Sequence, residues 1–152
     1  MSPVNPRNIE DSSRESNQRR SLHTQAQPQI LVADDNDSTK WALEQLLESS
    51  GYEVIAVSDG SELLYELEPV ILEEADSRPP DLIITDVRMP GINVFNIVEQ
   101  LREIGFDTPV IIVTGYGSDR VRHRTHQLGR AVYFEKPVDI DRLEESVAAL
   151  LA

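Results

Sequence analysis

No cysteine occurs among the 152 residues of the chain. Disulfide bonds and thiolate metal sites are therefore excluded, which fits a reducing compartment. Long apolar runs are also missing, since no stretch approaches the roughly 20 residues that span a bilayer. The N-terminus lacks the apolar core of a secretory signal. We therefore expect a soluble, cytoplasmic protein without a membrane partner.

Basic side chains are scarce as well. The chain has 14 Lys and Arg against 27 Asp and Glu, so its net charge is −13 at pH 7. Residues 1–28 hold four basic and three acidic groups, so the excess of negative charge lies in residues 29–152. Residues 29–152 are so acidic that they should repel the phosphates of nucleic acids. We expect no direct nucleic-acid partner and favour a divalent cation or a basic protein surface.

Composition divides the chain into a tail and one domain. Residues 1–28 contain five serines, three prolines and few apolar groups, too few to offset the entropy lost on ordering. We expect a disordered tail, either a plain leader or a tether or docking peptide. Residues 29–152 are enough for a single domain with a sizeable core.

From residue 29 onward, apolar runs alternate with segments of helical periodicity. The runs are continuous, which is typical of parallel strands buried on both faces. They predict strands at residues 30–33, 54–57, 82–84, 110–113 and 131–134. Helices are predicted at residues 37–50, 61–77, 93–104, 118–128 and from about 139 onward. We expect Asp37 or Ser38 to cap the first helix and Pro69 to kink or split the second.

Five strands that alternate with five helices predict an α/β fold with right-handed crossovers. The flavodoxin-like, doubly wound parallel sheet with strand order 2-1-3-4-5 is the commonest solution for five strands. Ligands of such folds bind beyond the carboxyl ends of the strands, where the strand order reverses. The residues that follow the strands are therefore the candidate site.

Four of the predicted strands are followed by side chains suited to phosphoryl or metal chemistry. These are Asp34 and Asp35, then Asp86, Thr114 and Lys136. Each alone is more often a helix cap, a strand end or a solvated loop residue, but their occurrence together favours one functional site. Two carboxylates about 4 Å apart repel by roughly 4 kcal/mol at an effective dielectric near 20, so a cation is expected to relieve the cluster. Hard oxygen ligands favour Mg²⁺, with Mn²⁺ as a substitute.

Four motifs contain these residues: Asp34-Asp35-Asn36, Asp86-Val87-Arg88-Met89-Pro90-Gly91, Val113-Thr114-Gly115 and Tyr133-Phe134-Glu135-Lys136-Pro137. Together they resemble the response-regulator receiver domain of two-component signal transduction, over about four fifths of the chain. The resemblance implies a phosphorelay switch rather than an enzyme. Its phosphoryl donor is expected to be a sensor histidine kinase or a histidine phosphotransfer protein.

The resemblance also implies a role for each acid. Asp86 matches the phospho-acceptor. Asp35 and Asp86 match the direct carboxylate ligands of Mg²⁺, joined by the backbone carbonyl of Arg88. Asp34 matches the acid that acts on the ion through water.

Three further residues match the groups that sense the phosphoryl group. Thr114 matches the hydroxyl that hydrogen-bonds it, and Lys136 the ammonium that pairs with one of its oxygens. Tyr133 matches the aromatic side chain that turns inward on activation, and the Lys136–Pro137 bond matches one that is cis in the family. The face built from helix 118–128, strand 131–134 and the last helix is then expected to bind a downstream partner or a second copy.

Two local features suggest how the switch is tuned. Arg88 and Tyr116 lie two residues beyond Asp86 and Thr114, at positions that in the family flank the path of the attacking water. Two large side chains there predict a slowly decaying phospho-form, unless both point to solvent. Residues 118–130 hold four arginines and one aspartate, so this helix is expected to be mobile and to meet an acidic partner or a second protomer.

Two other functions are compatible with the same residues. A Mg²⁺-dependent phosphohydrolase with an aspartyl nucleophile generally needs a second, general-acid aspartate just after the first, and Arg88 stands in that neighbourhood. A scaffold that is never phosphorylated is also compatible with the fold, although the intact set of acids argues against it. A single-domain switch and the receiver of a longer DNA-binding regulator would share all of these features.

Overall fold

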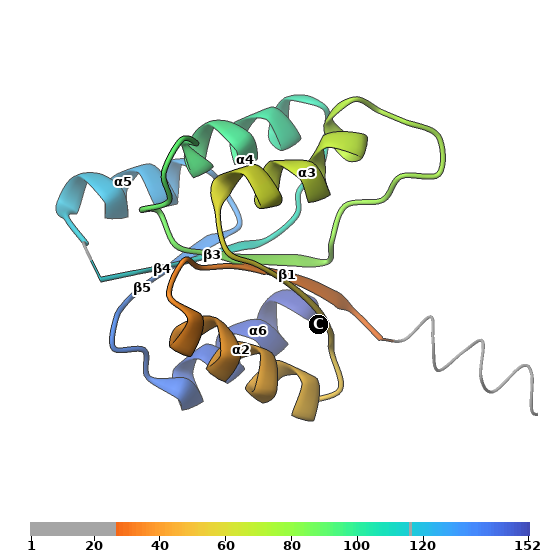
Figure 1. Cartoon of the computed structure of the whole chain (residues 1–152). Coiled ribbons are helices and arrows are strands. Elements are labelled where there is room, and N and C mark those ends of the chain that lie inside the picture. The colour runs from red at the N-terminus through yellow and green to blue at the C-terminus, as the bar shows by residue number, and fades with distance from the viewer. Residues whose placement is uncertain (1–26, 116) are drawn as a thin grey trace, which may run out of the picture.

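The computed structural model describes residues 27–115 and 117–152, so most of the predicted tail and Tyr116 lie outside the described residues. In this part of the chain strands and helices alternate (Figure 1). The strands are β1 (Gln29–Ala33), β2 (Glu53–Val57), β3 (Leu82–Thr85), β4 (Val110–Thr114) and β5 (Ala131–Glu135). The helices are α2 (Asp37–Ser49), α3 (Gly60–Ile71), α4 (Val94–Glu103), α5 (Asp119–Gln127) and α6 (Ile140–Leu151). None of these helices is long and apolar enough to cross a bilayer.

Within the described ranges the strands form one parallel sheet in the order β2-β1-β3-β4-β5, which confirms the predicted α/β fold. Strand β1 pairs with both β2 and β3, and Ala33 at its end lies opposite Val57 and Thr85. The strand order reverses at this point. The residues that follow β1 and β3 therefore emerge side by side, and these include Asp34 and Asp86.

Helices cover both faces of the sheet. Figure 1 shows α3, α4 and α5 on one face and α2 and α6 on the other. Along β1, Leu31 and Ala33 belong to the core that includes α3 and α4, whereas Ile30 and Val32 belong to the core that includes α2 and α6. Successive residues of a strand point to opposite faces, so a strand covered on both sides must be apolar throughout. Coverage of the sheet on both faces therefore explains why the apolar runs in the sequence are continuous.

Side-chain caps set where the helices begin. Asn36 has an extended backbone and its side chain accepts the amide of Thr39 at 2.9 Å, so the helix α2 begins at Asp37. The expectation that Asp37 or Ser38 caps this helix is wrong, because Asn36 supplies the cap one residue earlier and leaves Asp37 in the first turn, where the helix dipole favours a carboxylate. Asp139 caps α6 in the same way, since its side chain accepts the amide of Arg142 at 3.3 Å.

Helix α3 is shorter and more continuous than the pattern predicts. A helix to about residue 77, kinked or split at Pro69, was expected, but α3 continues through Pro69 and ends at Ile71. The missing amide of Pro69 weakens only the last turn, and the buried side chain of Val70 holds this turn against the core. Glu73 then adopts a positive φ of 54°, so the chain leaves the helix as a turn.

Candidate functional site

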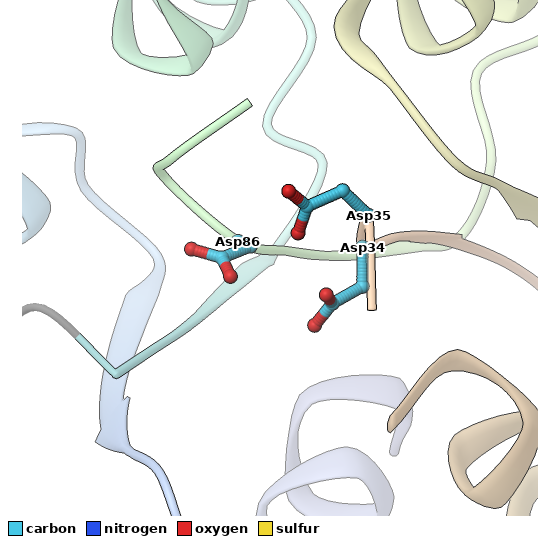
Figure 2. Close-up of side chains that lie close together, drawn as sticks. All are labelled: Asp34, Asp35 and Asp86. Atoms are coloured by element: carbon cyan, nitrogen blue, oxygen red, sulfur yellow. The ribbon is translucent and has the colours of Figure 1, made fainter. Parts of the chain in front are cut away.

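Three carboxylates converge at the reversal point of the sheet. Asp34 and Asp35 follow β1 and Asp86 follows β3, and one oxygen from each lies within 4.8 Å of the others (Figure 2). Asp34 and Asp86 are buried, with 1% and 5% of their surface exposed, whereas Asp35 is exposed. The cluster therefore has two acids fixed in the protein and one that faces solvent.

Lys136 joins the two buried acids. Its ammonium lies 2.8 Å from Asp34 Oδ2 and 2.9 Å from Asp86 Oδ2. The second oxygen of each acid accepts a backbone amide, since the Asn36 N–H donates to Asp34 at 2.8 Å and the Arg88 N–H donates to Asp86 at 3.0 Å. Buried charges are costly unless they are paired and hydrogen-bonded. These bonds satisfy that condition, which explains how the fold tolerates the acids.

The electrostatics of Lys136 follow from the same contacts. Partial burial lowers the pKa of its ammonium, but the hydrogen bonds from Lys136 to Asp34 and Asp86 outweigh it, so the pKa lies above its ordinary value. The side chain therefore carries its positive charge at neutral pH. The backbone amide of Lys136 donates to the carbonyl of Thr114 at 3.0 Å, which ties the end of β5 to the end of β4.

Thr114 and the Lys136–Pro137 bond lie as the motifs indicated. Thr114 is the last residue of β4 and is buried, with 1% of its surface exposed. The Lys136–Pro137 peptide bond is cis, in agreement with the resemblance. The ends of four of the described strands thus meet at one edge of the sheet.

A pocket of about 710 Å³ opens over this edge. Its lining residues are Asp35, Asn36, Asp86, Arg88, Met89, Pro90, Gly115 and Lys136. The formal charges of three carboxylates and one ammonium sum to −2, which a divalent cation would balance. The donors are all hard oxygens, the ligands that Mg²⁺ prefers, so the residues present fit this ion.

The structure does not place Tyr133 with the acids. Its hydroxyl donates to Glu135 Oε1 at 3.2 Å, and the Arg122 guanidinium lies 4.9 Å from the centre of its ring. Partial burial and the hydrogen bond to Glu135 raise the pKa of the Tyr133 hydroxyl. Arg88 is exposed and lines the pocket beside Asp86.

The whole domain, and not only its cluster of acids, matches a known protein family. A family model of the response regulator receiver domain matches residues 30–148. The chain belongs to this family. As a receiver domain it is part of a two-component system, in which such domains act as signalling switches.

Relatives of known function differ in how much of their length this receiver domain covers. Sporulation initiation phosphotransferase F of Bacillus subtilis is 28% identical over 122 residues, which are 80% of this chain and 92% of that protein. The C4-dicarboxylate transport transcriptional regulatory protein DctD of Pseudomonas aeruginosa is 32% identical over 127 residues, 83% of this chain but only 26% of DctD. The chain therefore spans about a quarter of one curated relative and most of another.

Solved structures agree with this assignment. The signal receiver domain of the putative Luxo repressor protein from Vibrio parahaemolyticus superposes with a TM-score of 0.70 at 27% identity, covering 82% of this chain and 90% of that domain. A CheY-like receiver domain protein from Methanospirillum hungatei gives 0.71 at 25% identity, with 83% and 94% covered. The sheet order and helix layers are therefore those of receiver domains.

Sequence reasoning missed the partners of Tyr133 and the amides that hold the acids. Glu135 and Arg122 contact Tyr133, but Glu135 was seen only as part of a motif and Arg122 only as one charge of a basic helix. An arginine on one element and a glutamate on the next, thirteen residues apart, carry no recognisable spacing. The Asn36 amide was foreseeable, because a residue two positions after an aspartate often donates to it in an Asx turn.

Proposed function

We propose that this receiver domain is a phospho-acceptor switch in which Asp86 takes a phosphoryl group from a sensor histidine kinase or a histidine phosphotransfer protein, in a Mg²⁺-dependent reaction. The position of Asp86 carries the proposal. It is buried, bonded to Lys136, beside two further carboxylates, and still part of the lining of an open pocket. A carboxylate held in this way is oriented and accessible, as a nucleophile must be.

The residues proposed to hold the ion are those of the cluster. The carboxylates of Asp35 and Asp86 and the backbone carbonyl of Arg88 would bind Mg²⁺ directly, and Asp34 would act through water. Mn²⁺ would substitute. A bound divalent ion neutralises charge on the phosphoryl oxygens.

The transfer needs little movement of the protein. A carboxylate oxygen of Asp86 attacks the phosphorus atom, and the bond from phosphorus to the donor's histidine nitrogen breaks. Lys136, now 2.9 Å from Asp86, moves its hydrogen bond to a phosphoryl oxygen and keeps its bond to Asp34. Thr114 supplies a hydroxyl from the neighbouring strand end. The protein positions the groups and offsets charge, which are the main contributions to phosphoryl transfer.

The surroundings of Lys136 suggest where the donor protein binds. An apolar pocket of about 560 Å³ lies between α2 and the segment after β5, and Lys136, Pro137, Val138 and Leu43 are among its lining residues. An apolar helix face of the donor would fill it and bring the phosphohistidine over Asp86. Phosphorylation would then turn Tyr133 inward and change the face of α5, β5 and α6 for a downstream partner or a second copy.

Incubation with acetyl phosphate and Mg²⁺, followed by intact-mass analysis, tests the proposal. We expect the mass of one added phosphoryl group on the wild type, and none on Asp86→Asn. Asp35→Asn should lose most of the Mg²⁺ dependence, whereas Asp37→Asn, an exposed acid outside the cluster, should behave as wild type.

The alternatives predict different results of the same experiment. Turnover of many phosphate esters without a stable adduct would indicate a phosphohydrolase. The absence of any reaction, in a protein that folds normally, would indicate a scaffold and overturn the proposal.

A further inference from the structure

Two side chains outside the acid cluster hold Tyr133, namely Glu135 and Arg122. Its hydroxyl donates to Glu135 Oε1 at 3.2 Å, and its ring lies under the Arg122 guanidinium at 4.9 Å. Arg122 also pairs with the same Glu135 oxygen at 3.5 Å. The three side chains thus form a closed triangle in which each residue contacts the other two.

Gly117 completes this arrangement. A Cβ built at Gly117 would collide with the Tyr133 hydroxyl and with Glu135 Oε1. The backbone of Gly117 does not lie in the left-handed region, so conformation alone does not require glycine there. The missing side chain instead leaves the space that the Tyr133 hydroxyl occupies.

We propose that Arg122 and Glu135 are positioning residues that hold Tyr133 in the outward conformation and thereby oppose the response to a phosphoryl group on Asp86. The inference rests on the proposed function, because it concerns the switch that phosphorylation drives. Inward rotation of Tyr133 must break its hydrogen bond to Glu135 and its stacking on Arg122. Whatever stabilises the outward conformation therefore weakens the binding of any phosphoryl group that favours the inward one.

The triangle also connects two elements of the fold. Arg122 lies on α5, whereas Tyr133 and Glu135 lie on β5. When Tyr133 leaves, α5 loses its contact with the tyrosine ring. The outward tyrosine therefore keeps α5 in its resting position, and its release frees the helix to move.

Removal of Arg122 should change the affinity for an anion at Asp86 in the direction opposite to the one that long-range charge alone would give. Removal of the positive charge of Arg122 should weaken the binding of an anion at Asp86 if long-range charge alone matters. Loss of the contact with Tyr133 should strengthen it. Exposed cation–π contacts and ion pairs each shift an equilibrium by about two- to fivefold, so a tightening of this size is expected.

The test uses the purified protein, Mg²⁺ and beryllofluoride, an anion that mimics a phosphoryl group on a carboxylate. The apparent dissociation constant is measured by fluorine NMR. Arg122→Ala should bind about two- to fivefold more tightly than the wild type, and Glu135→Ala likewise. Arg124→Ala is the matched control, because Arg124 lies on the same helix but stacks on Phe95 and pairs with Glu99. This control should not tighten binding.

A double-mutant cycle separates positioning from any other effect of these residues. In a Tyr133→Ala background, the tightening caused by Arg122→Ala should disappear. Gly117→Ala provides a test without a change of charge, since its methyl group displaces the Tyr133 hydroxyl and should also tighten binding.

Each outcome is decisive. Equal or weaker binding by Arg122→Ala, or a tightening that persists without Tyr133, overturns the positioning role while the proposed function stands. A wild-type protein that binds no beryllofluoride and accepts no phosphoryl group at Asp86 overturns the proposed function, and this inference with it.

Discussion

Glu135 and Lys136 are neighbours at the end of β5, yet their side chains have very different surroundings. The Lys136 side chain is 21% exposed and bonds two buried carboxylates at 2.8 and 2.9 Å. The Glu135 side chain is 57% exposed and its contacts to Tyr133 and Arg122 are longer, at 3.2 and 3.5 Å. Burial strengthens charge interactions and exposure to water weakens them.

The difference in burial gives these two adjacent residues different roles, because Lys136 holds the site together and Glu135 takes part in the proposed switch. The buried contacts of Lys136 fix the geometry of the acids, and breaking them removes the cation that Asp34 and Asp86 share. The exposed contacts of Glu135 are weak enough to be exchanged, as a switch requires.

The largest effect is expected from Lys136→Met. This change leaves Asp34 and Asp86 buried without their shared cation, and breaking a buried pair costs about 3–5 kcal/mol. Because each acid keeps its amide bond, we expect a loss of about 3 kcal/mol in the free energy of unfolding. Urea unfolding at pH 7 without divalent ions measures it.

Lys40→Met is the matched control. Lys40 pairs with Asp37 at 3.5 Å, and the side chain of that aspartate is 93% exposed. The same chemical change should cost less than about 1 kcal/mol there. The Lys40 side chain is itself only 18% exposed, so equal losses at both sites would show that burial of the paired acids makes no difference.

A smaller effect is expected from pH, through the same ammonium. The pKa of Lys136 is raised in the folded protein because the hydrogen bonds to Asp34 and Asp86 outweigh burial. Its contribution to stability is therefore complete below the unfolded value near 10.4 and is lost as the pH rises through the folded pKa. The stability difference between wild type and Lys136→Met should be constant from pH 7 to about 10 and shrink above it. A difference that grows above pH 10 would contradict this assignment.

The smallest effect is expected in the local stability of α5, the helix that contains Arg122, the partner of the exposed Glu135. Thr125 is the only buried residue of α5, whereas α4 contains five buried residues. Helices with few buried contacts open more easily. Hydrogen exchange should therefore show lower protection in α5 than in α4.

Protection within α5 should also rise toward its C-terminal end. There the Arg102 guanidinium donates to the carbonyls of Leu128 and Gly129 at 3.0 and 2.9 Å, which anchors this end of the helix. If α5 were the best-protected helix, its expected mobility would be wrong.

Much of the fold could be predicted because the relevant signals are local. The run from Ile30 to Ala33 is apolar at every position, and this alone indicates a strand with two covered faces. Pro69 shows the limit of such signals. Its effect on α3 depends on the core beneath Val70, which no local pattern contains.

Local sequence is enough to place the acids, the threonine and the lysine at the strand ends, because these residues directly follow the apolar runs along the chain. Which of these groups bond to one another depends on the folded arrangement. Lys136 lies fifty residues from Asp86 but bonds it, whereas Glu135 turns to Tyr133 and Arg122. Successive side chains near the end of a strand face different surroundings, and packing alone sets which are buried. This difference in packing makes Lys136 part of the site and its neighbour Glu135 part of the proposed switch.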